Sequence, residues 1–98
     1  MRQHHVVYPK GKNVSIMPSV LIPVADGTEE LELVSVTNPL ARAGVDYKLA
    51  SVKPDSVSVA CARGIKLTAD VKMVDVVDET FDLVVLPGNN KDYSEIQF

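Results

Sequence analysis

Glu32 is the side chain whose type and position most suggest proton-transfer chemistry. It follows a run of apolar residues and an acidic turn in the block 20–34, about one turn into a predicted helix. A carboxyl partly buried by Val36 and a neighbouring strand would be desolvated, which disfavours its charged form and suits it to donate or accept a proton. The pattern fits equally well a solvated glutamate on an exposed helix face.

Gly88 and Asn89 follow a second apolar run, residues 81–88, which has the same form as the first and is predicted to lie beside it. The chain must turn sharply there, and asparagine is the non-glycine residue best suited to a left-handed backbone conformation. Backbone N–H groups in such a turn can bind an oxyanion, although an ordinary turn at a strand end needs the same residue types.

Cys61 is the only cysteine, and it lies close to Arg63, whose charge would lower the pKa of a nearby thiol and make it reactive. A buried or incidental cysteine is the favoured alternative from general cysteine usage. His4 and His5 have no cysteine or acidic partner nearby, so no metal site is expected. The glycine spacings of phosphate loops and dinucleotide motifs are missing, which disfavours a nucleotide-binding module. No cofactor is predicted.

The pattern of apolar runs predicts an α/β fold with a parallel sheet and right-handed crossovers. The predicted elements, in order, are a buried strand at 19–25, a helix at about 29–43, a strand at 46–52, a hairpin or an extended excursion of 57–60 and 65–68 bending at Gly64, one or two helical turns within 70–78, and a buried strand at 81–86.

The predicted helix carries several local signals. Asp26 and Glu29 resemble a capping box, and Glu29 and Glu30 suit the positive end of the helix dipole, whereas Glu32 lies further in, where that benefit has faded. Pro39 should either kink the helix near Ser35 or begin a new helix. The expected apolar face and stop signal are Leu33, Val36, Leu40 and Ala43, followed by Gly44.

Composition and charge narrow the class of protein. Ninety-eight residues suffice for one small domain, and 46% hydrophobic with 23% charged residues is typical of a globular protein. The net charge of −3 argues against nucleic acid or an anionic membrane as partner, and no apolar stretch is long enough to span a membrane. A single cysteine fits a reducing compartment, so we expect the cytoplasm.

The N-terminal segment is interpreted apart from the domain. Residues 1–18 are predicted to form a flexible tail, and residues 19–98 a partial α/β domain. The tail contains Arg2, Lys10 and Lys12 and no acidic residue, which leaves an organelle-targeting leader as the alternative.

Four segments together carry a resemblance to a known family: DGTEELELV, LARAG, CARGIKLTAD and FDLVVLPG. They resemble the N-terminal half of the ThiJ/PfpI superfamily and, within it, the deglycase-like ("DJ-one") branch. The resemblance covers residues 19–88. The combination of an EExE-type helix start with a strand ending in LPG is fairly specific to this branch, and each piece alone is weak.

The resemblance implies a flavodoxin-like, three-layer α/β sandwich, of which this chain is the N-terminal part, and commonly a homodimer. It implies cofactor-free glyoxalase or deglycase activity on small aldehydes or glycated proteins, in defence against oxidative and carbonyl stress. Glu32 matches the family's helix-borne glutamate, which hydrogen-bonds a cysteine nucleophile, and Gly88 matches the first glycine of a turn whose backbone lines the oxyanion pocket. Cys61 matches a peripheral cysteine.

The sequence departs from the family where the site would be completed. Asn89 replaces the second glycine of the LPGG turn, and the nucleophile and a later histidine would lie beyond Phe98. The first hypothesis is therefore an enzyme truncated before its nucleophile, inactive as these 98 residues. The alternative is a non-catalytic family member with a chaperone-like or regulatory role, which binds a second copy or a full-length relative through an exposed sheet edge.

Overall fold

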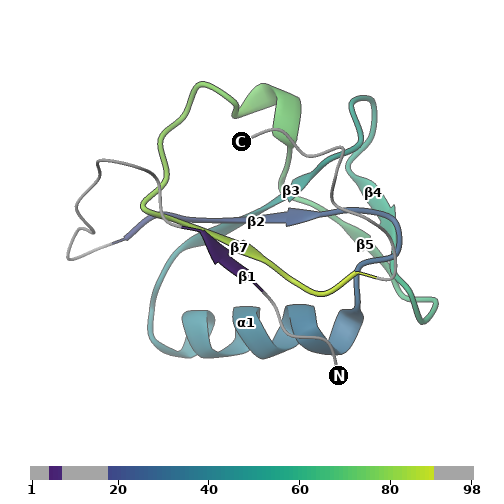
Figure 1. The fold of residues 1–98 in the computed structure, drawn as a ribbon, viewed down its shortest axis with the longest axis horizontal. Coiled ribbons are helices and arrows are strands. Elements are labelled where there is room, and N and C mark those ends of the chain that lie inside the picture. Colours follow the sequence, from purple (N-terminus) through teal and green to yellow (C-terminus); the bar gives the residue numbers. More distant parts are fainter. Residues whose placement is uncertain (1–4, 8–17, 90–98) are drawn as a thin grey trace.

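The computed structural model describes residues 5–7 and 18–89. Its elements are β1 (His5–Val7), β2 (Val20–Val24), α1 (Glu30–Arg42), β3 (Tyr47–Ser51), β4 (Ser58–Ala60), β5 (Lys66–Thr68), β6 (Val71–Lys72), a 3-10 turn η1 (Met73–Asp75) and β7 (Leu83–Leu86). Five strands form one sheet in the order β1-β7-β2-β3-β6, and β4 and β5 form a separate hairpin (Figure 1).

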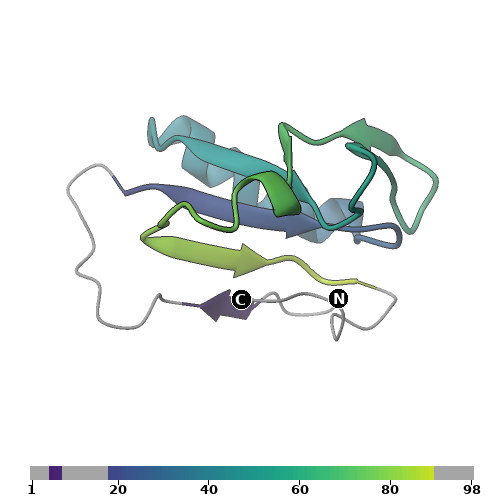
Figure 2. The same cartoon turned by 90° about the horizontal axis from the view of Figure 1, so that it is seen from above.

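The centre of the sheet is parallel, as the sequence predicts. All five residues of β2 are buried, and β2 pairs in parallel with β3 on one side and β7 on the other. A central strand packed on both faces has no exposed side for polar residues, which explains its uninterrupted apolar run. Because β2 and β7 run in the same direction, their carboxyl ends meet at one edge of the sheet (Figure 2).

Helix α1 covers one face of this sheet (Figure 1). Leu33 and Val36 are buried in the core cluster with Val20 and Ile22, and Leu40 packs against the same cluster. The predicted apolar face is therefore correct except for its last member, Ala43, which is exposed and lies one residue beyond the end of the helix.

The predicted stop of α1 at Gly44 is confirmed, whereas the predicted restart of the helix at Pro39 is not. Gly44 stops the helix as predicted: its φ of 74° is a left-handed conformation that glycine adopts at little cost. The helix passes through Pro39 without a break, so the predicted restart there is wrong. The hydroxyl of Ser35, four residues earlier, donates to the carbonyl of Leu31 at 2.7 Å in an exposed hydrogen bond. Ser35 lies on the same side of the helix as Pro39, which has no backbone N–H to donate.

The opposite face of the sheet packs against the segment that includes η1 (Figure 1). A second core cluster gathers Leu21, Ala50, Val84, Val76 and Phe81 there. The sequence predicted one or two helical turns in this segment, but it begins with β6, a two-residue strand parallel to β3. Only then does the single 3-10 turn follow. A strand of that length is too short to show an alternating pattern.

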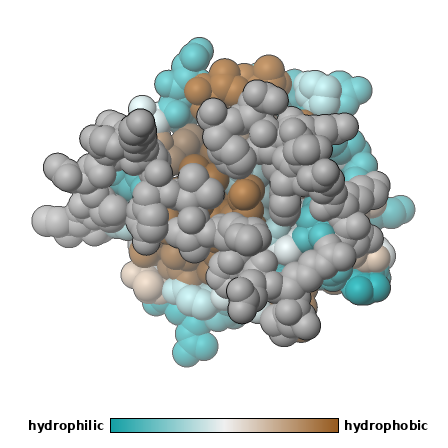
Figure 3. Space-filling view, viewed as in Figure 1, coloured by the Kyte–Doolittle hydropathy of each residue, from teal (hydrophilic) through white to brown (hydrophobic). Residues whose placement is uncertain are grey.

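Two exposed valines mark the outer surface of this segment. Val74 is 53% and Val77 62% exposed. Figure 3 shows hydrophobic surface at the corresponding edge of the molecule, over η1.

The N-terminal strand corrects one prediction. Residues 1–18 were expected to form a flexible tail, but His5–Val7 pairs antiparallel with β7 at one edge of the sheet. The expectation of a tail is wrong for these three residues. Residues 1–4 and 8–17, including His4, lie outside the described residues. No helix in the described part of the chain has the length and apolar character needed to cross a membrane.

Candidate functional site

The edge where β2 and β7 end brings the predicted site residues together. The backbone N–H of Glu29, at the start of α1, donates to the carbonyl of Gly88 at 2.8 Å. Thr28, one residue before Glu29, and Asn89, one residue after Gly88, form an isolated antiparallel bridge. The turn after β7 is therefore held directly against the turn that opens the helix, although the two lie about 60 residues apart in the sequence.

Glu32 points into the protein at this junction. Its exposed fraction is 3%, which excludes a solvated glutamate on an outer helix face. Because α1 begins at Glu30, Glu32 lies within the first helical turn. The prediction that it sits beyond the reach of the helix dipole is therefore wrong, and the free N–H groups of that turn favour a negative charge there.

Gly88 is required by the position of the Glu32 carboxylate. A Cβ built on Gly88 would overlap Oε2 of Glu32 and would lie 2.6 Å from the carboxyl carbon and 2.9 Å from Oε1. The sequence instead suggested that Gly88 and Asn89 serve a sharp turn with a left-handed backbone conformation. Neither residue has a positive φ. The left-handed turn expected at Asn89 is thus wrong, and Asn89 is instead 6% exposed in its bridge with Thr28.

One oxygen of the Glu32 carboxylate has no hydrogen-bond donor among the described residues. Oε1 is fully buried and unpaired. Buried polar atoms in folded proteins are nearly always hydrogen-bonded, because leaving one unpaired costs about 1–3 kcal/mol. Oε1 lies beside the turn at Gly88. In this position it could accept a hydrogen bond from a ligand or from another part of a site.

Thr28 supports this junction and was not singled out from the sequence. It is fully buried, and its hydroxyl accepts the N–H of Ala25 at 2.9 Å. Its carbonyl accepts the N–H of Ala62 at 2.8 Å, which joins the same turn to the β4–β5 hairpin. The available signal was a threonine in a strand-to-helix turn, where a side-chain oxygen can replace missing backbone partners.

Asp26 has a different role from the predicted one. The residue at the N-cap of α1 is Glu29, and it makes no side-chain capping bond. Asp26 instead accepts the N–H of Ala60 at 3.0 Å and forms an ion pair with Lys53 at 3.4 Å. The expected capping box is therefore wrong, and this carboxylate fixes the hairpin to the end of β2.

Glu30 holds the tip of the same hairpin. Its carboxylate accepts the N–H of Arg63 at 2.9 Å and the N–H of Ile65 at 3.1 Å. Desolvation alone would raise the pKa of Glu30, but hydrogen bonds from its own N–H, Ile65 and Arg63, together with the Arg63 charge, hold it below its ordinary value. Glu29 adds an ion pair to the largely exposed Arg63 side chain at 3.6 Å.

Cys61 is a buried thiol with a raised pKa. It is 6% exposed, and burial, followed by the charges of Glu30 and Asp26, raises its pKa. This direction is opposite to the one that Arg63 was expected to impose. A thiol that resists ionisation is a poor nucleophile, so the geometry favours the alternative of a structural cysteine.

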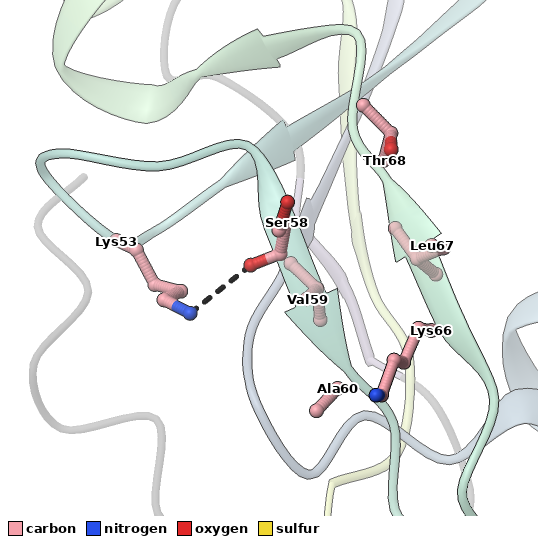
Figure 4. A pocket seen from close by; sticks show the side chains of 7 residues that line it. All are labelled: Lys53, Ser58, Val59, Ala60, Lys66, Leu67 and Thr68. Atoms are coloured by element: carbon pink, nitrogen blue, oxygen red, sulfur yellow. Dashed lines mark hydrogen bonds between the residues drawn. The ribbon is translucent and has the colours of Figure 1, made fainter.

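Figure 4 shows a pocket on the β4–β5 hairpin. It has a volume of about 240 Å³ and is lined by Lys53, Ser58, Val59, Ala60, Lys66, Leu67 and Thr68. Lys53 is already engaged there, because its ammonium donates to the carbonyl of Ser58 at 3.0 Å. Neither Glu32 nor Gly88 lines this pocket, so it is not the predicted site. In the described part of the chain, no cluster of three or more His, Cys, Asp or Glu residues could hold a metal ion.

Comparison with known proteins assigns the chain and its fold to a family. The chain belongs to the DJ-1/PfpI family, whose profile matches residues 18–96. The structure of oxidised DJ-1 from Toxoplasma gondii is similar, with 40% identity, a TM-score of 0.71, and coverage of 74% of this chain and 39% of that one. Together with the parallel sheet, this shows the predicted flavodoxin-like α/β fold, of which part is present.

Curated relatives agree with this assignment. Protein DJ-1 homolog A of Arabidopsis thaliana is 47% identical over 74 residues, which is 76% of this chain and 19% of the relative. The Caenorhabditis elegans protein named glutathione-independent glyoxalase DJR-1.2 is 35% identical over 71 residues, which is 70% of this chain and 36% of the relative. The chain thus spans well under half the length of either protein.

The contact between Glu32 and Gly88 can be tested by a double-mutant cycle. We expect Gly88→Ala to lower the free energy of unfolding by about 2 kcal/mol or more, because the new methyl group overlaps a buried carboxylate. In a Glu32→Ala background the same change should cost less than about 1 kcal/mol, because the overlapping atoms are gone. Urea unfolding of the four proteins measures both values.

Gly44→Ala provides the matched control for this cycle. A Cβ at Gly44 meets no atom within 4 Å, although its φ is positive. Its cost should be the same in both backgrounds. Equal costs for Gly88→Ala with and without Glu32 would contradict the proposed contact.

Docking of the hairpin by Glu30 predicts a pH dependence of stability. Because the folded state holds the pKa of Glu30 below its ordinary value of 4.5, the carboxylate stabilises the fold above that pH. The contribution is lost as the pH falls through the lowered pKa. In Glu30→Gln the loss of stability on acidification should be smaller, and the amides of Arg63 and Ile65 should exchange faster at neutral pH. Unfolding curves between neutral and acid pH, with amide exchange by NMR, measure both effects, and an unchanged acid limb would contradict this role.

Proposed function

We propose that this chain provides the glutamate-bearing part of a cofactor-free glyoxalase or deglycase site that acts on small aldehydes or glycated proteins during carbonyl and oxidative stress. The observation that carries the proposal is the buried carboxylate of Glu32, which packs on Gly88 where two parallel strands end and has one oxygen without a donor among residues 5–7 and 18–89. Ligands of open parallel sheets bind beyond this edge. The glyoxalase name of the worm relative supports the reaction class.

In this proposal Glu32 holds the proton that a thiol nucleophile loses when it attacks the carbonyl carbon of an aldehyde. The backbone of the turn at Gly88 and Asn89 lies beside the developing oxyanion. Cys61 does not suit the role of nucleophile, because it is buried and its pKa is raised. The thiol would therefore come from the part of the family domain that this chain does not span, and these 98 residues alone should not consume methylglyoxal.

A non-catalytic role is the second candidate, favoured by apolar side chains around the start of α1. Leu31 and Val34, one helical turn apart, are 65% and 53% exposed. Ile65 is 58% exposed, and Glu30 holds its backbone beside the same helix end. Exposed apolar residues that cluster in this way mark interaction surfaces, and the occupant we propose is a second copy of the chain or a full-length relative. A reducing compartment such as the cytoplasm fits the free thiol of Cys61.

A chimera with the worm glyoxalase separates the two candidates. Residues 19–88 of this chain would replace the matching segment of that protein, which supplies the remainder of the domain. If Glu32 handles the proton, the folded chimera should consume methylglyoxal, and Glu32→Gln should lower kcat by about 100-fold or more.

Glu29→Gln in the same chimera is the matched control, because that side chain pairs with exposed Arg63 and does not enter the junction. It should leave kcat within about threefold of the unmodified chimera. A folded chimera whose activity is indifferent to Glu32→Gln would overturn the catalytic proposal. Turnover by the isolated 98 residues would overturn the placement of the nucleophile outside them.

A further inference from the structure

The β4–β5 hairpin has a polar outer face that the junction of Glu32 and Gly88 does not use. Side chains alternate along a strand, so Ser58 and Ala60 of β4 share one face. Their partners across the hairpin are Thr68 and Lys66, respectively, and all four residues are exposed. Val59, between the first two, is 1% exposed and belongs to the core. The hairpin therefore folds against the protein with one face and turns the other to solvent.

The pocket of about 240 Å³ lies on this outer face. Short side chains at Ser58 and Ala60 leave room over β4, while longer ones from β5 and from the loop before β4 surround it. Figure 4 shows Lys53 and Lys66 on opposite sides of β4. Pockets for drug-sized ligands measure roughly 300–1,000 Å³, so a pocket of this size suits a small group.

The polar side chains that line the pocket can all donate hydrogen bonds, and none of them is acidic. The ammonium of Lys66 and the hydroxyls of Ser58 and Thr68 have no hydrogen bond or ion pair to any residue in the described part of the chain. Three donors without a protein acceptor thus border one hollow. A negatively charged ligand is the one that such a lining favours.

Lys53 contributes differently from Lys66. Its ammonium donates to the carbonyl of Ser58 at 3.0 Å and pairs with Asp26 at 3.4 Å, so its charge is partly offset. Lys66 therefore supplies the main positive charge. It lies two residues from Thr68 along β5, about 7 Å, a separation that the four-carbon lysine side chain can span.

We propose that this pocket binds the phosphate group of a small molecule, with Lys66 as the charged contact and the hydroxyls of Ser58 and Thr68 as further donors. A phosphate monoester presents three terminal oxygens, one for each donor, whereas a carboxylate presents two. The net charge of −3 disfavours a polyanion such as nucleic acid as the source of the phosphate. This site is separate from Glu32 and does not rest on the proposed glyoxalase or deglycase function.

Titration of the full, ¹⁵N-labelled chain with inorganic phosphate at constant ionic strength tests the site. We expect saturable NMR shifts of the amides of Ser58, Ala60, Lys66 and Thr68, with a dissociation constant in the millimolar range, because few contacts hold the ion. Lys66→Met removes the ammonium but keeps an unbranched side chain, and should raise the dissociation constant about tenfold or more. Thr68→Val, which removes one hydroxyl, should raise it about threefold.

Lys48→Met is the matched control, because it makes the same change of charge outside the pocket, at a residue paired with Glu79. Its dissociation constant for phosphate should stay within about twofold of that of the unmodified chain. Glycerol 3-phosphate should bind at least as tightly as inorganic phosphate, while glycerol should not bind and acetate should bind more weakly.

Four results would overturn the proposal. The first is the absence of saturable shifts at the pocket amides in the unmodified chain, which needs no variant. The second is an equal dissociation constant in Lys66→Met, and the third is an equal response to acetate. The fourth is failure of glycerol 3-phosphate to bind where inorganic phosphate does, because it would show a site for the free ion only.

Discussion

The hydrogen bond from the N–H of Glu29 to the carbonyl of Gly88, 2.8 Å long, is the contact on which the rest of the site depends. It joins the first residue before α1 to the turn after β7, and so fixes the helix relative to the strand ends. The side chain of Glu32, less than one turn along the helix, lies with its carboxylate against the backbone of Gly88. The absence of a side chain at Gly88 is what lets the two approach.

The acidic turn serves two purposes with different carboxylates. Asp26 and Glu30 accept backbone N–H groups from the β4–β5 hairpin and hold it against the helix start. Glu32 lies against Gly88 instead, and one of its carboxylate oxygens has no donor in the part of the chain that the structure describes. Asp26 and Glu30 stabilise the fold through charge-assisted hydrogen bonds, whereas Glu32 lowers its stability. Residues that serve a function often have such a cost. Neighbouring residues of one type thus have opposite effects on stability.

The pattern of apolar residues in the sequence made much of the fold predictable. The continuous apolar runs of β2 and β7, the spacing of Leu33 and Val36, and the stop at Gly44 each follow from local rules that the tertiary structure respects. Contacts between distant segments were not predictable in this way. The bonds from Asp26 to the hairpin and the pairing of β1 with β7 join residues more than 30 positions apart, and no local pattern specifies such partners.

The sequence predicted that Glu32 and Gly88 belong together, but it did not predict how they meet. Glu32 and Gly88 were identified together, but the glycine was attributed to a sharp turn, while the structure shows that it makes room for a carboxylate. Steric need of this kind is invisible in a sequence, because it depends on which side chain arrives from another element.

The central claim is that Glu32 is held buried, with one carboxylate oxygen that has no donor among the described residues, at a cost to the fold. Its most direct test is the free energy of unfolding of Glu32→Met, which keeps a flexible side chain of similar length and removes the polar oxygens. The account predicts a gain of about 1–3 kcal/mol, with Glu30→Met as the neighbouring control that should lose stability. A loss of stability in Glu32→Met would contradict the account, because it would mean that the buried carboxylate is well paired in the folded chain.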